Sequence, residues 1–246
     1  GQGQLGNNTV VNSLSPVKVH SVDNLGDLSS IASIAANGFN TAAISATGFV
    51  YTWGFNADGE LGNASTADSR IPVQVFSGEQ GGGTYLHNIS SVAIGGSHML
   101  ALGIDGSVYS WGYNGDGELG NSTTIDSHTP VRVLSGGQGG GTYLHNISQI
   151  SAGDCHSLAL SDSGFVYSWG YNSDGQLGNG TTDSSLIPVR VVSGEQGGGA
   201  YLQNVSSISA GSSHNLAIVS GYVYSWGQNH GPRGEALDPW GQLGNG

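Results

Sequence analysis

Histidine recurs at one position of a long repeat, as His98, His156 and His214, with 58 residues between consecutive copies. Histidines that converge in space bind metal ions or act as general bases. Copies one repeat apart are instead expected in separate structural units, far from one another. We therefore predict that each histidine anchors a turn of its own unit through a side-chain hydrogen bond, and we predict no metal site.

Carboxylates also recur in register, in the turn sequence Asn-x-Asp-Gly-[Glu/Gln]-Leu-Gly. The aspartates are Asp58, Asp116 and Asp174. A calcium loop needs several alternating oxygen ligands, whereas each copy offers one Asp and in two cases a Glu. The Asp-Gly pair instead favours a tight turn. Equivalent carboxylates in separate units do not form an acid–base pair, so no catalytic residue is assigned.

The one cysteine, Cys155, precedes His156. Adjacent residues of a strand point to opposite faces, so these two do not form a nucleophile–base pair readily. The sequence contains no nucleophile elbow, phosphate-binding or dinucleotide-binding motif. We therefore predict that the protein is not an enzyme and that it has no cofactor.

The elements that position these residues repeat four times. A Val-Tyr-x-Trp-Gly segment places tryptophan at Trp53, Trp111, Trp169 and Trp226, at intervals of 58, 58 and 57 residues. Pro-Val-x-Val begins at residues 16, 72, 130 and 188, and Gly-[Glu/Gln]-Leu-Gly-Asn occurs five times. Each repeat contains four short apolar or alternating segments that are separated by Gly-rich turns, and none shows helical periodicity. The repeat therefore predicts an all-β protein, a β-propeller built from four-stranded blades.

These motifs, in this order, resemble the regulator of chromosome condensation repeat. The resemblance covers the whole chain and implies a β-propeller, usually of seven blades, whose members recognise proteins through loops on one face. We expect a bacterial-type secreted variant. Guanine-nucleotide exchange, which some members perform, is a distant alternative because the matching motifs are those that form the fold.

One propeller region is expected over residues 1–246. The repeats are approximately 1–50, 51–108, 109–166 and 167–223, followed by a partial repeat and insert at 224–246. Three arrangements are consistent with four repeats: part of a larger ring, a closed ring of four blades in which the N-terminal strand completes the last blade, or one ring shared by two chains. An unpaired terminal blade would leave strand edges open.

A glycine-rich segment, Ser-Gly-x-Gln-Gly-Gly-Gly-x-Tyr-Leu, recurs at 77–86, 135–144 and 193–202. In a propeller it links the outermost strand of one blade to the innermost strand of the next, so its copies line one face. Because successive side chains of an extended segment point to opposite faces, we expect Leu86 to be buried and Tyr85 and His87 to lie on the opposite face. Tyrosine among small residues is typical of recognition loops. The predicted contact residues are Tyr85, His87, Tyr143, His145, Tyr201 and Gln203.

The four repeated tryptophans are expected to pack between neighbouring blades. Trp240 lies outside the repeat, in the insert at 229–241, and is a further candidate contact residue.

The net charge of −12, with five Lys and Arg residues in total, argues against nucleic-acid binding, and no apolar run is long enough for membrane insertion. Low charge with abundant Gly, Ser, Asn and Thr favours an extracellular or cell-surface location. In such a location, seven Asn-x-Ser/Thr sequences are possible N-glycosylation sites. They are Asn7, Asn63, Asn88, Asn121, Asn146, Asn179 and Asn204.

The function predicted from these features is non-catalytic recognition of a protein partner through the Gly/Tyr-rich loops. One alternative is a propeller that binds glycans in repeated, equivalent pockets. The other is a structural subunit that self-associates through open terminal blades into a surface assembly or filament.

Overall fold

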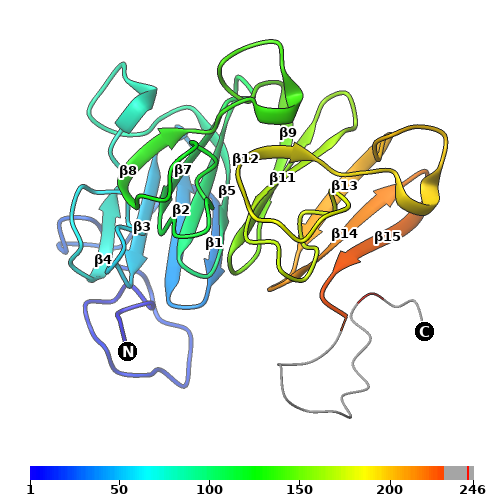
Figure 1. Cartoon of the computed structure of the whole chain (residues 1–246). Helices are drawn as coiled ribbons and strands as arrows, with labels where there is room; N and C mark the ends of the chain where they lie inside the picture. The colour runs from blue at the N-terminus through cyan, green and yellow to red at the C-terminus, as the bar shows by residue number, and fades with distance from the viewer. Residues whose placement is uncertain (230–242, 244–246) are drawn as a thin grey trace.

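The computed structural model describes residues 1–229 and Leu243 as a row of antiparallel β-sheets, each formed by consecutive strands (Figure 1). The first sheet contains β1 (Ile31–Asn37), β2 (Asn40–Ser45), β3 (Val50–Gly54) and β4 (Ser69–Gln74). The second contains β5 (Ile89–Ile94), β6 (His98–Gly103), β7 (Val108–Gly112) and β8 (Ser127–Arg132). The third contains β9 (Ile147–Ala152), β10 (His156–Ser161), β11 (Val166–Gly170) and β12 (Ser185–Arg190).

The fourth sheet has three strands within the described part of the chain: β13 (Val205–Ala210), β14 (His214–Val219) and β15 (Tyr222–Gly227). The only helical segments in the described residues are three single turns, η1 (Gly78–Gln80), η2 (Gly136–Gln138) and η3 (Gly194–Gln196). The predicted all-β propeller architecture is therefore confirmed. We refer to the four sheets as blades 1 to 4.

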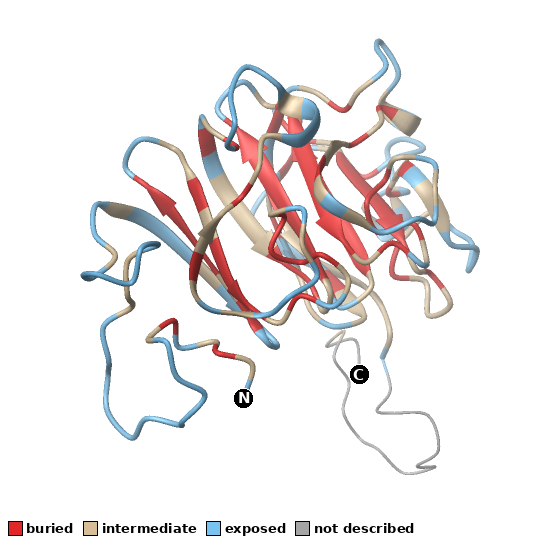
Figure 2. Cartoon of the chain, turned by 90° about the vertical axis from the view of Figure 1, so that its left-hand side faces the viewer, coloured by how far each residue is buried: buried red, intermediate tan, exposed pale blue. Residues whose placement is uncertain are grey.

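The core lies between successive blades and contains the middle strands of the first three blades together with buried residues of the innermost strands. Strands β6 and β10 are buried at every position, and so are β7 and β11 (Figure 2). A separate apolar cluster fills each of the three blade interfaces. Among the side chains in these clusters are Trp111 and Trp169, both 0% exposed.

The N-terminal segment lies against blade 1 and does not pair with blade 4. Its Gln4 carbonyl accepts hydrogen bonds from Trp53 Nε1 at 2.8 Å and from Thr41 Oγ1 at 3.1 Å. Pro16–Val19 is not part of any sheet, although the motif repeat predicts a strand there. The N-terminus and β15 lie at opposite ends of the row (Figure 1). The closed arrangement in which the N-terminal strand completes the last blade is therefore not the one observed.

Candidate recognition surface

The three glycine-rich segments form one loop structure that is repeated from blade to blade. In the first, Ser77 donates from its hydroxyl to the Gly83 carbonyl at 2.6 Å. The Gln80 side chain donates to the His87 carbonyl at 2.7 Å and accepts from the His87 backbone N–H at 3.0 Å. Gln138 and Gln196 make the same pair of bonds to His145 and Gln203. The loops are thus fixed by their own polar groups, and all three project at the same end of the strands (Figure 1).

The predicted contact tyrosines lie at the bases of these loops, each held by a neighbouring side chain. Tyr85 stacks on Phe76, with ring centroids 5.8 Å apart. The Arg132 guanidinium lies 4.2 Å from the ring centroid of Tyr143, and that of Arg190 lies 5.1 Å from Tyr201. Tyr85 and Tyr201 remain 36% and 40% exposed. The rings therefore rest on the blade and still offer part of their surface to solvent.

The alternation predicted for this segment is confirmed. Leu86 is 0% exposed, whereas His87 and Tyr85 face outward. The His87 ring nitrogen Nδ1 lies 3.0 Å from the Tyr85 carbonyl, and His145 repeats this contact with Tyr143. The first two loops thus each bring their own tyrosine and histidine together, whereas the third loop has Gln203 in place of the histidine. Trp240 lies outside the described residues.

Two arginines are part of this surface, and sequence reasoning did not identify them. Arg132 and Arg190 occupy the variable position of Pro-Val-x-Val, and the Nε atom of each is buried without a hydrogen-bond partner in the described structure. Arg190 also lies 5.0 Å from the ring centroid of Phe165, and it borders a pocket of about 320 Å³ that His145 and Asn146 help to line. Their signal in the sequence was only that two of the chain's five basic residues each precede a loop tyrosine by 11 residues.

The blade interfaces confirm the predicted packing for three of the four repeated tryptophans, whereas Trp53 packs against the N-terminal segment. Trp111, Trp169 and Trp226 each donate from Nε1 to a backbone carbonyl of the preceding blade, that of Glu60, Glu118 and Gln176, at 2.7–2.9 Å. The prediction that each histidine anchors its own blade is wrong. His98 Nε2 lies 2.9 Å from Ser157 Oγ in the next blade, and His156 Nε2 lies 2.7 Å from Asn215 Oδ1. Burial lowers the pKa of His98 to about 3, so the ring is neutral and serves as a structural link.

The recurring acidic turns also have structural roles. Asp116 donates its backbone N–H to Glu118 Oε2 at 2.9 Å, which closes the turn that was predicted from the Asp-Gly pair. Glu118 is 0% exposed, and burial raises its pKa to about 7. Burial likewise raises the pKa of the Cys155 thiol to about 11, so its nucleophilic thiolate is scarce at neutral pH.

Six of the seven possible glycosylation sites fall into two structural classes. Asn88, Asn146 and Asn204 are exposed and have positive φ angles of 53–58°, in the turn that leads into the first strand of a blade. Asn63, Asn121 and Asn179 are less exposed, and each accepts a hydrogen bond through Oδ1 from the asparagine seven residues earlier. Glycosylation at any of these residues stays a prediction.

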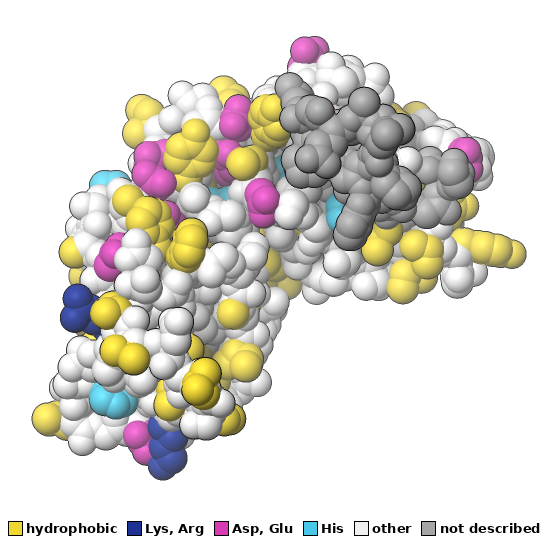
Figure 3. Space-filling view, turned by 90° about the horizontal axis from the view of Figure 1, so that it is seen from below, with side chains coloured by type: hydrophobic (Ala, Val, Ile, Leu, Met, Phe, Trp, Pro, Cys, Tyr) yellow, Lys and Arg dark blue, Asp and Glu magenta, His cyan; other side chains and the backbone are white. Residues whose placement is uncertain are grey.

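Residues 1–229 and Leu243 contain no group of three or more His, Cys, Asp or Glu side chains placed to hold a metal ion. No helix among them has the length and apolar character required to span a membrane. The molecular face viewed from below carries scattered acidic and apolar side chains and little Lys or Arg (Figure 3).

Known proteins share both the sequence pattern and the fold. The family model described as RCC1-like domain matches residues 1–246. The chain is 32% identical over 232 residues to the ultraviolet-B receptor UVR8 of Arabidopsis thaliana, covering 92% of this chain and 47% of the receptor. It is 36% identical over 199 residues to the probable E3 ubiquitin-protein ligase HERC3 of Homo sapiens, covering 80% of this chain and 17% of that protein.

Solved structures give the same result. Human WBSCR16 superposes with a TM-score of 0.72 and 26% identity, over 93% of this chain and 55% of that one. Yeast RCC1 (Prp20), in a crystal with bound Kap60, gives a TM-score of 0.62 and 25% identity over 81% and 44%. The chain spans about half or less of the length of these relatives. Its blades, their interlocking tryptophans and the match along all 246 residues show that it belongs to the RCC1-like domain family.

Proposed function

We propose that this chain is a non-catalytic protein-recognition module, which binds its partner through the loops η1, η2 and η3 and the tyrosines at their bases. The observation that carries the proposal is the repetition of one rigid loop on successive blades, at the same end of the strands (Figure 1). Half-exposed tyrosines beside glycine-rich tips have the composition of protein-binding loops. A relative crystallised with Kap60 supports a protein as the partner class.

The proposal is tested by capturing partners from the native source, with two variants of the surface. The first replaces Tyr85, Tyr143 and Tyr201 with Ala. The second replaces His87, His145 and Gln203 with Ala, and it preserves the glutamine bonds because those bonds go to the backbone. The matched control is Ile125→Ala, which changes a side chain 74% exposed in the turn at the other end of the strands.

We expect both surface variants to lose the captured partner, while the control retains it and all variants still unfold cooperatively above the temperature of the capture assay. Retention of the same partner by both surface variants would show that binding uses another face. Partner identification by mass spectrometry also separates a protein ligand from a glycan.

We further propose an extracellular or cell-surface location. It is supported by the low charge content and by the exposed positions of Asn88, Asn146 and Asn204. Treatment of the native protein with an N-glycan amidase should lower its mass and convert the modified asparagines to aspartates. An unchanged mass, together with recovery of the protein from the cytosolic fraction, contradicts the proposal.

A further inference from the structure

Arg190 is the last residue of β12, and its guanidinium lies among three aromatic rings. The guanidinium carbon is 5.0 Å from the ring centroid of Phe165 and 5.8 Å from that of Tyr167. It is 5.1 Å from the ring centroid of Tyr201. Aromatic faces attract a cation but do not replace the oxygen acceptors that its N–H groups require. The rings therefore position the guanidinium and leave its donors to be satisfied by other groups.

The donors of this guanidinium are poorly satisfied within the described part of the chain. Nη2 donates to the Gln138 carbonyl at 3.5 Å, which is a long and weak hydrogen bond. Nε is buried without a partner. The ion pair found among the described residues joins Lys18 and Asp27, so no carboxylate of these residues is paired with Arg190. A guanidinium has five N–H donors and matches the two oxygens of a carboxylate.

The equivalent arginine of blade 2 has an acidic group of its own chain close by. Arg132 Nη2 donates to Ser107 Oγ at 3.5 Å, and Ser107 Oγ in turn donates to Asp105 Oδ2 at 3.1 Å. Blade 3 has Phe165 at the position of Ser107, and it has Ser163 at the position of Asp105. The turn between β10 and β11 therefore supplies no carboxylate at this position to the arginine of blade 3.

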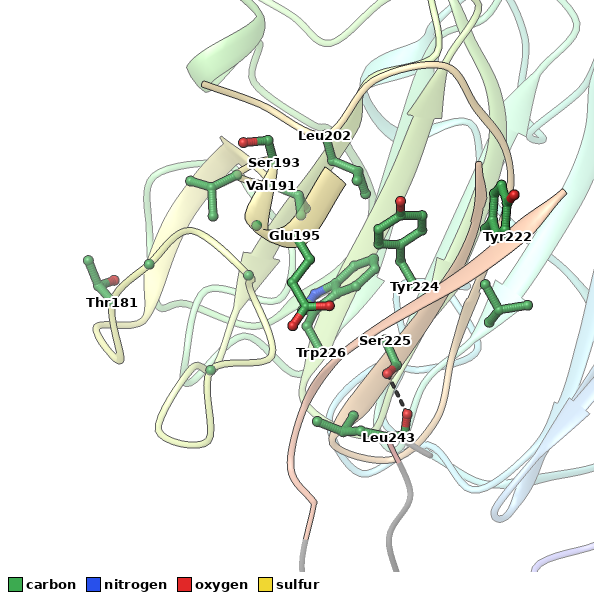
Figure 4. Close-up of a pocket in the computed structure, with 16 residues that line it drawn as sticks. Thr181, Val191, Ser193, Glu195, Leu202, Tyr222, Tyr224, Ser225, Trp226 and Leu243 are labelled. Carbon is green, nitrogen blue, oxygen red and sulfur yellow. Dashed lines mark hydrogen bonds between the residues drawn. The ribbon is translucent and has the colours of Figure 1, made fainter. Parts of the chain in front are cut away.

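A second internal carboxylate is also missing from blade 3. In blade 2, Glu79 of loop η1 accepts the Arg132 backbone N–H through Oε2 at 2.7 Å. Loop η3 has a glutamate at the same position, Glu195, which is labelled in Figure 4. Loop η2 has Gly137 there instead, and a Cβ on Gly137 would lie 3.3 Å from the backbone nitrogen of Arg190. The position that a carboxylate occupies in blade 2 therefore has none in blade 3.

A pocket of about 320 Å³ gives an outside group access to this arginine. Loop η2 contributes Gln138 and His145 to the pocket wall, and the turn between β10 and β11 contributes Asp162 and Phe165. The volume is in the range of known ligand sites and is large enough for a side chain. All the lining residues lie between residues 138 and 190, so the pocket is formed by blade 3 and the loop that leads into it.

We propose that Arg190 binds an acidic side chain, Asp or Glu, which the protein partner inserts into this pocket. The inference rests on the proposed function, because it specifies the chemistry of the partner that the loops bind. The incoming carboxylate accepts two parallel N–H···O bonds from the guanidinium. The surrounding rings exclude water and so strengthen these charged bonds. The partner's carboxylate thus takes the part that Asp105 and Glu79 play in blade 2.

The charge of the whole chain makes this interaction easy to recognise. The net charge is −12, so the molecule as a whole repels an acidic peptide. Asp162, an exposed residue of the pocket wall, adds to that repulsion. Binding of an acidic peptide therefore reports a specific site and not a general attraction. Removal of the Asp162 charge should strengthen such binding.

The test measures the fluorescence anisotropy of a labelled oligoglutamate peptide that is titrated with the protein. Oligoglutamine and oligolysine peptides with the same label are the controls for charge. The main variant is Arg190→Gln, which copies Gln74, the residue at this position in blade 1, and so is compatible with the fold. The matched control is Arg70→Gln, which removes the same charge from an exposed position in β4.

Two further variants change the charge of the pocket in opposite directions and leave Arg190 in place. Gly137→Glu restores the glutamate that loops η1 and η3 have at this position. Asp162→Asn removes the acidic group of the pocket wall. If the ligand is a carboxylate, the first variant should weaken binding and the second should strengthen it. A cationic ligand would reverse both effects.

We expect the wild-type chain to bind the oligoglutamate peptide in preference to both control peptides. Arg190→Gln should weaken this binding about tenfold or more, which is the loss expected when a charged hydrogen bond is removed. Arg70→Gln should leave the binding unchanged. Absence of oligoglutamate binding, equal effects of the two arginine variants, or stronger binding of oligolysine overturns the proposal.

Capture of the native partner distinguishes this inference from the proposed function. Arg190→Gln should lose the captured partner, as the tyrosine variant should. If the tyrosine variant loses the partner and Arg190→Gln retains it, the loops bind a protein but no acidic side chain docks at Arg190. If oligoglutamate binding requires Arg190 and the tyrosine variant still captures its partner, the pocket binds carboxylates and the proposed recognition surface is wrong.

Discussion

The buried carboxyl of Glu118 makes the stability of this chain depend on pH. Its Oε2 accepts the Asp116 N–H, whereas Oε1 is buried without a hydrogen-bond partner in the described structure. Burial, together with the nearby Asp116 and Asp126, raises the pKa of this carboxyl from 4.5 to about 7, against the lowering effect of backbone hydrogen bonds. The folded chain therefore holds this proton more tightly than the unfolded chain does.

The sign and size of the effect follow from linkage. Because the unfolded carboxyl loses its proton first, the free energy of unfolding falls as pH rises from about 4.5 to 7, and it then stays lower. At about 1.4 kcal/mol per pKa unit, a rise from 4.5 to about 7 corresponds to roughly 3 kcal/mol at alkaline pH. The chain already contains an amide at the equivalent position, where Gln176 Oε1 accepts the Asp174 N–H at 3.0 Å. A glutamine therefore fits this turn without a charge.

We expect Glu118→Gln to raise the free energy of unfolding by about 2–3 kcal/mol at about pH 8, and to change it little at about pH 4. Urea unfolding followed by tryptophan fluorescence at several pH values measures both quantities. Glu195→Gln, at an exposed glutamate, is the matched control and should have no pH-dependent effect. If Glu118→Gln changes stability equally at both pH values, the buried carboxyl does not titrate as argued.

Three further predictions concern the blade interfaces. His98→Asn, which copies Asn40 of blade 1, should reduce the fall in the free energy of unfolding between about pH 6.5 and 3, because the pKa of the buried ring is lowered from 6.5 to about 3. Urea unfolding across that pH range measures the fall, and an unchanged pH dependence contradicts the prediction. Gly120→Ala should destabilise the fold by more than about 1 kcal/mol, because the φ angle of Gly120 is +64° and the new Cβ would lie 2.9 Å from Trp169 Nε1. Gly180→Ala is the control, because Gly180 also has a positive φ angle but no such neighbour. Cys155 should react with iodoacetamide about a hundredfold more slowly than a free thiol near neutral pH, because its pKa is raised from 9.0 to about 11; a rate equal to that of a small-molecule thiol contradicts the burial.

The sequence was sufficient to predict the blades because their determinants are local and repeated. The Val-Tyr-x-Trp-Gly segments became β3, β7, β11 and β15, and the Asp-Gly turns close as expected. The burial of Leu86 followed from simple alternation along the strand. In each case the residue's neighbours in sequence determine its position in the blade.

The contacts between blades could not be predicted in the same way. The partner of His98 is Ser157, 59 residues away, and the corresponding partner of His156 is Asn215. This partner position is Thr41 in blade 1 and Met99 in blade 2, so no fixed motif marks it. Similarly, Arg132 and Arg190 occupy a position that the motif leaves free, and only the folded chain places their guanidinium groups over aromatic rings.

The unequal polar links between blades determine where this row of sheets separates under stress. Ser157 and Asn215 each add a second hydrogen bond to the carbonyl that receives the tryptophan, those of Glu118 and Gln176. Met99, at the equivalent position in blade 2, has no hydrogen-bond donor and cannot add such a bond to the Glu60 carbonyl. Where each unit contacts only its neighbours, stability is a sum of nearest-neighbour terms. Under force or mild denaturant, blade 1 should therefore peel away from blade 2 first, so that amide hydrogens of β1–β4 exchange before those of the central blades.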